Sequence, residues 1–167
     1  MDEKTRQNLK NAISGESQAH MKYNAFFEAA KKEGKANVAR LFKAIAFAEE
    51  VHAFNHLKVL GSIGSTVDNL SAAMAGEIFE VEKMYPEYYN EAKAKNEEEA
   101  VQSFGYALAA EKIHAEMYQK AKETVLQGKD LEIDEVYVCS VCGHTREANL
   151  PENCPVCGVK KELFKKF

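Results

Sequence analysis

The chain has 167 residues, of which 46% are hydrophobic, and its formal net charge at pH 7 is −4. This length suffices for one well-packed domain and a small second module. The acidic balance offers no basic surface to nucleic acid, and no apolar run approaches the roughly 18 residues of a membrane-spanning helix. We therefore expect neither nucleic acid nor a membrane as a partner.

The composition indicates two domains in a reducing compartment. The first residues lack the charged-then-apolar pattern of a secretory signal, so we expect a cytoplasmic location, where thiols stay reduced. Helix-forming residues dominate up to about Gln127, whereas Val, Pro and Cys-Gly pairs follow, and all four cysteines lie beyond position 138. We predict domains at residues 1–130 and 135–167.

Four successive segments carry apolar residues at helical spacing, which predicts helices over residues 3–33, 36–60, 70–95 and 97–127. Gly34 and Asn96 mark short turns after the first and third segments, and such turns make antiparallel neighbours. The longer connection over residues 61–69 would cross the bundle. The fold class expected is an all-α four-helix bundle, up-down with a long crossover, followed by a small four-cysteine domain.

Carboxylates and imidazoles interrupt the apolar stripes of these helices, as where Val38, Leu41 and Ile45 lead into Glu49 and His52. Burying an isolated carboxylate costs several kcal/mol, and no Lys or Arg lies on the stripes to compensate. A bound metal is the simplest compensation. The candidate ligands are Glu16, Glu49, His52, Glu77, Glu80, Glu111 and His114.

The arrangement is duplicated. Glu49-x-x-His52 recurs as Glu111-x-x-His114, 62 positions later, and Glu16 recurs as Glu77. A single Glu-x-x-His is usually a solvated pair, but two on apolar stripes match the ligand set of ferritin-like di-iron or di-manganese proteins. Oxygen-rich ligation favours iron or manganese over zinc. Spacing alone leaves open which glutamates bridge two metals and which are terminal ligands.

Glu80 breaks the duplication, because its counterpart on the first helix is Ala19. The extra carboxylate suggests a ligand that one metal exchanges, and the alternative is a surface glutamate one turn after Glu77. With Glu80 included, the chain resembles the rubrerythrin family over the whole bundle. The resemblance rests on the Glu16 and Glu-x-x-His motifs, on Gly76-Glu77-Ile78-Phe79-Glu80 and on Met84-Tyr85-Pro86.

This resemblance implies a pair of non-haem irons with oxo and carboxylate bridges. Glu49 and Glu111 would be the bridging carboxylates, Glu16 a terminal ligand of one iron, and Glu77 and His114 ligands of the other.

The resemblance also implies that the first iron takes Glu80 when oxidised and His52 when reduced. Tyr23 and Tyr85 match tyrosines beside the family's site, where a phenol can hydrogen-bond a ligand carboxylate. As bare sequence features, both tyrosines would more often be simple core aromatics. His20 and His56 are interpreted as core histidines or as supporting residues outside the ligand set.

The C-terminal segment holds two Cys-x-x-Cys-Gly knuckles, which predict one tetrahedral metal site. A zinc ribbon has the same spacing, and the spacing alone favours zinc over iron. The knuckles resemble rubredoxin, however, and the rubrerythrin family joins such a domain to its bundle, which implies iron, with zinc possible. His144 is expected at the surface, and Val136, Tyr137, Leu163 and Phe164 are expected to form a minimal core. The ligands would be Cys139, Cys142, Cys154 and Cys157.

The implied function is a peroxidase that reduces hydrogen peroxide in oxidative-stress defence. The donor would be a rubredoxin or an NAD(P)H-dependent reductase, because the chain has no dinucleotide-binding glycine motif of its own. In this family the four-cysteine domain commonly serves another subunit, so a homodimer or higher homo-oligomer is expected. The alternatives are a ferritin-like ferroxidase that detoxifies iron and a structural bundle with a zinc ribbon.

Overall fold

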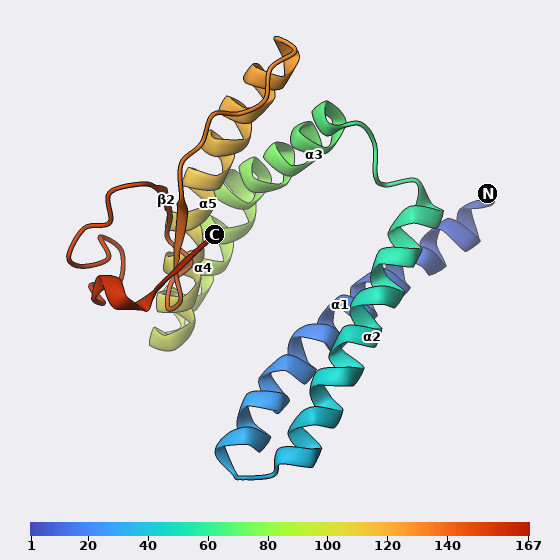
Figure 1. The fold of residues 1–167 in the computed structure, drawn as a ribbon, viewed down its shortest axis with the longest axis horizontal. Coiled ribbons are helices and arrows are strands. Elements are labelled where there is room, and N and C mark those ends of the chain that lie inside the picture. Colours follow the sequence, from blue (N-terminus) through green and yellow to red (C-terminus); the bar gives the residue numbers. More distant parts are fainter. The chain divides into compact units, whose positions relative to one another are not determined.

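The computed structural model describes residues 1–167, and the chain divides into two compact units, Met1–Gly64 and Ser65–Phe167 (Figure 1). The first unit is a helical hairpin. The second contains the remaining helices and a small sheet of three strands. None of the helices combines the length and the apolar character that crossing a bilayer requires.

The first unit pairs α1 (Glu3–Lys32) with α2 (Ala36–Leu60) in antiparallel fashion (Figure 1). The Asp2 carboxylate accepts a hydrogen bond from the Thr5 backbone N–H at 3.0 Å and so caps the free donors of the first turn. Alanines occupy every seventh position of α2 and are buried, and their small side chains allow two helices to approach closely. These alanines are Ala39, Ala46 and Ala53. Both helices lie where the sequence predicts them.

The apolar stripe of α2 is not covered within this hairpin. Leu41 is 61% exposed, and Val38 and Ile45 are also exposed, although the sequence analysis places all three on an inward stripe. A helix in a two-helix hairpin has one neighbour and buries one side only, so this stripe lacks a second layer within the hairpin.

In the second unit, the third predicted helix is divided into three parts. These are α3 (Thr66–Phe79), a π-helical turn η1 (Glu80–Met84) and α4 (Tyr85–Ala94), and α3 and α4 both pack against α5 (Glu98–Leu126). The predicted start at residue 70 is wrong. Ser65 and Asp68 form a capping box that starts the helix at Thr66 and shortens the preceding connection.

The C-terminal residues form an antiparallel sheet in the order β2-β1-β3, from β1 (Val136–Cys139), β2 (Thr145–Glu147) and β3 (Phe164–Lys166). A 3₁₀ turn, η2 (Lys161–Leu163), precedes β3. The small core of this C-terminal domain surrounds three buried cysteines and includes Tyr106 of α5. Phe164 packs there as expected, but Leu163 is 48% exposed, which corrects its predicted place in the core. The predicted fold class, mostly helical with a small four-cysteine domain, is confirmed.

Candidate metal centres

The first hairpin brings together Glu16 from α1 and Glu49 and His52 from α2. Their ligand atoms lie within 4.8 Å of one another. Nδ1 of His52 is 2.9 Å from Oε2 of Glu49 and 4.0 Å from Oε1 of Glu16. Residues three apart on a helix share a face, so α2 presents its glutamate and histidine side by side. The hairpin thus supplies two carboxylates and one imidazole at one place.

The second unit repeats this triad with Glu77 from α3 and Glu111 and His114 from α5. Their ligand atoms also lie within 4.8 Å of one another. Nδ1 of His114 is 2.6 Å from Oε2 of Glu111, and Nε2 of the same ring is 2.8 Å from the Thr145 hydroxyl. No lysine or arginine forms an ion pair with either triad, and the ion-pair partners of these carboxylates are His52 and His114. Such carboxylate clusters suit a divalent or trivalent cation.

Burial and mutual repulsion shift the acidic groups of the second triad. Burial, together with a hydrogen bond to Glu111 and its negative charge, raises the pKa of Glu77 to about 7. Burial and the charge of Glu111 also raise the pKa of Glu80. Carboxylates crowded in this way hold protons at neutral pH unless another cation replaces them. A bound metal ion would offset the repulsion between these carboxylates.

Glu80 lies on the π-helical turn η1, and this turn explains why the first repeat has no equivalent glutamate. Glu16 and Glu77 are 61 positions apart, whereas Tyr23 and Tyr85 are 62 apart, so one residue is inserted between the two landmarks of the second repeat. A π turn absorbs one extra residue without ending the helix, and such turns are frequent at functional sites. Glu80 is close enough to feel the charge of Glu111, but it is not part of the compact triad.

The two tyrosines occupy equivalent aromatic clusters. Tyr23 packs on Phe42 with ring centroids 6.4 Å apart, and Tyr85 packs on Phe104 at 6.3 Å. Burial and the negative charges of Glu80, Glu111 and Glu77 raise the pKa of Tyr85, so its phenol keeps its proton. Tyr85 therefore lies within electrostatic reach of the second triad as a hydrogen-bond donor.

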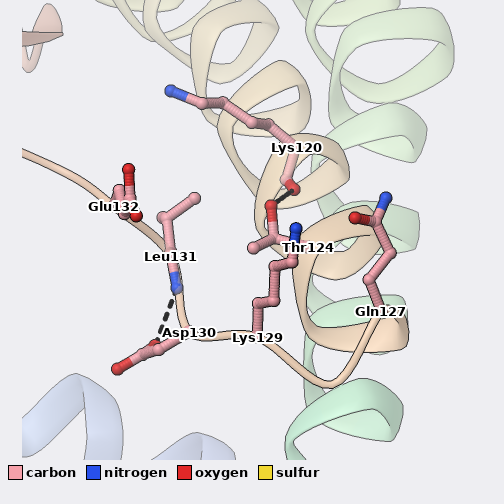
Figure 2. A pocket seen from close by; sticks show the side chains of 7 residues that line it. All are labelled: Lys120, Thr124, Gln127, Lys129, Asp130, Leu131 and Glu132. Atoms are coloured by element: carbon pink, nitrogen blue, oxygen red, sulfur yellow. Dashed lines mark hydrogen bonds between the residues drawn. The ribbon is translucent and has the colours of Figure 1, made fainter.

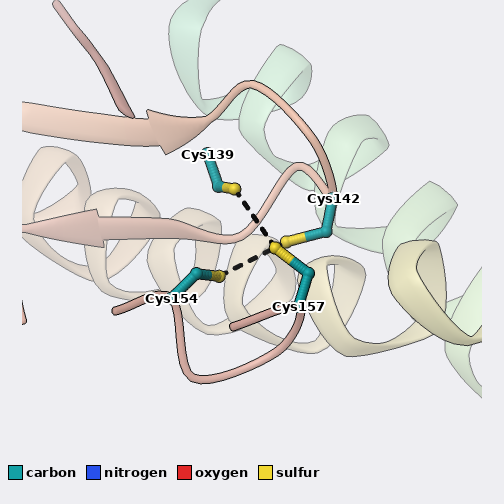
Figure 3. A group of neighbouring side chains, drawn as sticks. All are labelled: Cys139, Cys142, Cys154 and Cys157. Carbon is teal, nitrogen blue, oxygen red and sulfur yellow. Dashed lines mark hydrogen bonds between the residues drawn. The ribbon is translucent and has the colours of Figure 1, made fainter. Parts of the chain in front are cut away.

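The four cysteines converge on one point (Figure 3). The sulfurs of Cys139 and Cys157 are 3.6 Å apart, and those of Cys142 and Cys154 are 3.5 Å apart. Each knuckle ends in a glycine with φ of +77°, a left-handed conformation that glycine adopts without strain. Although burial opposes ionisation, backbone N–H groups of Cys157 and Val156 lower the pKa of Cys154 to about 7. This arrangement fits a tetrahedral metal held by thiolates.

The remaining histidines are not part of these clusters. His20 is partly buried and bonds through Nδ1 to the Ala46 carbonyl at 2.9 Å, so its ring has a partner outside the ligand cluster. His144, expected at the surface, is only 8% exposed, and its ring lies edge-on to Phe164. His144 immediately precedes β2, and its carbonyl accepts a hydrogen bond from the Cys139 backbone N–H at 2.9 Å. Burial lowers its pKa, so the ring is neutral.

A surface hollow of about 680 Å³ contains none of the candidate ligands. Figure 2 shows it at the end of α5, where it is lined by Lys120, Thr124 and Gln127 of the helix and by residues 129–132 of the segment that follows. Thr145, whose hydroxyl contacts His114, was not among the residues predicted from the sequence. No motif marks this threonine, because the contact joins residues 31 positions apart.

These features define a helical protein with clustered glutamate and histidine ligands and a C-terminal tetrathiolate domain. Residues 7–122 match the family model for rubrerythrin, and residues 137–165 match the model for the rubredoxin-like domain of rubrerythrin. The chain belongs to the rubrerythrin family. It therefore carries that family's di-iron site together with a four-cysteine, rubredoxin-like site.

Known relatives agree along nearly the whole chain. Rubrerythrin-2 from Clostridium acetobutylicum is 44% identical over 173 residues, covering 95% of this chain and 94% of that protein. Nigerythrin from Nitratidesulfovibrio vulgaris is 34% identical over 174 residues, covering 96% and 85%. A solved structure of fully reduced, all-ferrous nigerythrin matches with a TM-score of 0.58 and 33% identity, covering 98% of this chain and 86% of the other.

Proposed function

We propose that this protein is a peroxidase that reduces hydrogen peroxide to water in oxidative-stress defence. Each peroxide takes up two electrons and two protons and yields two waters. A pair of irons supplies two-electron exchange when bound, and a tetrathiolate iron exchanges one electron at a time. The observation that carries the proposal is the presence, in one chain, of two carboxylate–histidine triads and a four-cysteine cluster.

The proposed ligand set is the one that the resemblance implies. Glu49 and Glu111 bridge the irons, Glu16 is terminal on the first, and Glu77 and His114 bind the second. Support comes from the two triads, each of which offers a glutamate and a histidine from one helix and a second glutamate from its neighbour.

The exchange of His52 for Glu80 on the first iron is also part of the proposal. It is supported by the placement of Glu80 on a one-residue π insertion, outside the compact triad. An added anion stabilises the ferric state over the ferrous state, so a carboxylate suits the oxidised site and a neutral imidazole the reduced one.

Tyr85 is proposed to donate a hydrogen bond at the site, and Tyr23 is its counterpart in the first repeat. The raised pKa of Tyr85 supports this role, because a phenol that stays protonated remains a donor. Its packing on Phe104 limits the motion of the ring.

Electrons are proposed to enter at Cys139, Cys142, Cys154 and Cys157 from a rubredoxin or an NAD(P)H-dependent reductase. Four clustered cysteines with no disulfide among them suit a reducing compartment, which supports a cytoplasmic location. A homodimer or higher homo-oligomer is also proposed, and membership of a family in which the four-cysteine domain commonly serves another subunit supports it.

Anaerobic steady-state assays with iron-loaded protein test the proposal. With a rubredoxin and its reductase as donor, we expect NAD(P)H oxidation that depends on hydrogen peroxide and consumes the two in equal amounts. The matched control carries Cys142→Ser, which removes one thiolate and should abolish donor-linked turnover. Rapid oxidation of added Fe(II) without donor-linked peroxide loss would instead identify a ferroxidase.

A further inference from the structure

A groove with basic edges lies on the hairpin of α1 and α2, near the turn that joins the two helices. Its volume is about 550 Å³, and Phe27 and three alanines of α2 form its apolar floor. The ammonium groups of Lys31 and Lys43 lie 5.8 Å and 5.7 Å from the centroid of the Phe27 ring, so both cations are within cation–π range of one ring. The remaining lining residues are Ala36, Ala39, Arg40 and Ala44.

The positive charge of this groove is not balanced by carboxylates of its own hairpin. Residues 31–43 include five lysines and arginines but one glutamate, although the whole chain has a net charge of −4. The ion pairs of lysine and arginine all lie elsewhere in the chain. Lys43 and Arg40 donate only to neutral asparagine side chains, at 2.8 Å and 3.2 Å. An apolar groove with unpaired cations at its edges suits an acidic ligand that also carries apolar side chains.

The equivalent groove of the second repeat lacks this character. Gln102 and Gly105 stand 62 positions after Arg40 and Lys43, so two of the three cations are absent there. A carboxylate, that of Glu98, lines the corresponding hollow instead. A helical hairpin of this kind therefore forms without a basic groove, which indicates that the cations of the first repeat serve binding rather than folding.

The complementary segment is the connection between α5 and β1. Residues 130–135 read Asp-Leu-Glu-Ile-Asp-Glu and have no regular secondary structure. Ile133 is 40% exposed, and among the four carboxylates only that of Glu135 forms an ion pair, with Lys166. Side chains two apart in an extended segment lie on the same side, about 7 Å apart. Leu131 and Ile133 can thus face an apolar floor together while the carboxylates reach the cations at its edges.

Other acidic groups already have local partners. Glu98 and Glu99 lie in the first turn of α5, where the helix dipole favours negative charge. The carboxylates of Asp2 and Asp68 cap the starts of α1 and α3. This leaves residues 130–135 as the segment that combines apolar side chains with largely unpaired carboxylates.

We propose that the basic groove of one chain binds residues 130–135 of a second copy of the chain. Every copy carries both surfaces, so a symmetric pair makes the contact twice. The contact joins the segment between the two domains of one subunit to the helical hairpin of another. It involves neither metal nor peroxide, so its test does not depend on the proposed function.

Cross-linking with a carbodiimide tests the contact, because this reagent joins a lysine directly to a carboxylate that touches it. Isotopically labelled and unlabelled chains are refolded together, loaded with iron and cross-linked at low ionic strength, and the peptides are identified by mass spectrometry. We expect Lys31 or Lys43 of one isotope to be joined to residues 130–135 of the other. The ion pair of Lys120 and Glu147, 3.0 Å apart within one chain, is the internal positive control.

Arg40→Glu is the informative variant, because arginine does not react with the reagent and both lysines stay in place. Repulsion at the groove should lower the yield of these mixed-isotope cross-links about tenfold or more, and about 0.5 M salt should lower it in wild type. Gln102→Glu, at the equivalent position of the second repeat, is the matched control and should change nothing. Arg40 is exposed, so the variant should retain its helical circular dichroism.

A charge swap adds a rescue. One chain carries Lys31→Glu, Arg40→Glu and Lys43→Glu, and the other carries Asp130→Lys, Glu132→Lys and Asp134→Lys. Neither chain alone should form the groove–linker cross-link, because like charges meet, whereas a mixture of the two should form it between the altered positions.

Three results would overturn the proposal. Groove–linker cross-links confined to chains of one isotope would show that the segment binds its own chain. Their absence, while the Lys120–Glu147 cross-link forms, would show that the contact does not exist. Cross-links from Lys31 and Lys43 to a different acidic segment would assign the groove to another occupant.

Discussion

Replacing Glu77 with Gln tests the electrostatic crowding of the second triad in metal-free protein. Burial and Glu111 hold the pKa of Glu77 at about 7, compared with 4.5 in an unstructured chain. At a pH between these two values, Glu77 therefore keeps its proton in the folded protein, whereas it has lost that proton in the unfolded chain. Stability contributed by this group is complete below the unfolded pKa and is lost as pH rises toward 7. Gln has no such proton to lose and can still hydrogen-bond Glu111.

The magnitude follows from the size of the shift. Each pKa unit corresponds to about 1.4 kcal/mol, so the full shift would amount to about 3.4 kcal/mol. Glu77 is partly open to solvent, which screens the interaction, and a contribution of about 1–2 kcal/mol is more realistic. We therefore expect Glu77→Gln to gain about 1–2 kcal/mol of stability relative to wild type between about pH 4 and pH 8.

Denaturant unfolding of chelator-treated protein, followed by circular dichroism at both pH values and at fixed protein concentration, measures this difference. The control is Glu82→Gln on the same π turn, where the side chain is exposed and outside the triad, and its stability difference should not change with pH. If Glu77→Gln shifts stability equally at both pH values, the carboxylate is not crowded and the account of the triad is incorrect.

The other predictions concern the metals directly. Replacing Glu80 with Ala should leave about two irons in the di-iron site, by metal analysis, but slow peroxide turnover about tenfold or more, whereas Glu82→Ala should change neither. Unaltered turnover in the Glu80 variant would make this residue a bystander. Loading Fe(II) at about pH 7 should release about half a proton per chain from Glu77, because the metal displaces the proton that this carboxyl carries in about half of the molecules when pH equals its pKa of about 7. Calorimetry in buffers of different ionisation enthalpy detects this release, which Glu77→Gln should reduce. Cys154→Ala should remove the tetrathiolate colour and abolish the dispersed amide NMR signals of residues 136–167, since so small a domain needs its metal to fold. Retained dispersion would show that the sheet is stable without the metal.

The sequence predicted the elements whose signals are local or repeated. Helical periodicity located α1, α2 and α5 to within about a residue or two at each end. The duplicated Glu-x-x-His motif and the paired knuckles predicted clusters that the structure brings together, because three-residue spacing puts both side chains on one helix face. The early start of α3 was also readable, since Ser65-x-x-Asp68 is a capping box.

Other features depend on contacts that no single segment reveals. The π turn at Glu80 follows from a one-residue difference between the two repeats, which is evident only when Glu16, Glu77 and the tyrosines are compared together. The burial of His144 and the Thr145–His114 hydrogen bond arise where β2 packs on α5. Such tertiary contacts override the polar character that made His144 look like a surface residue.

The most direct test of the account is an anaerobic titration of iron-loaded, fully reduced protein with hydrogen peroxide, with absorbance and total iron followed together. Three ferrous irons per chain hold three electrons, and each peroxide removes two. The account therefore predicts a sharp endpoint at about 1.5 peroxides per chain, with full return of the ferric tetrathiolate colour. A colourless four-cysteine site, or oxidation of the iron pair with the tetrathiolate iron still reduced, would contradict it.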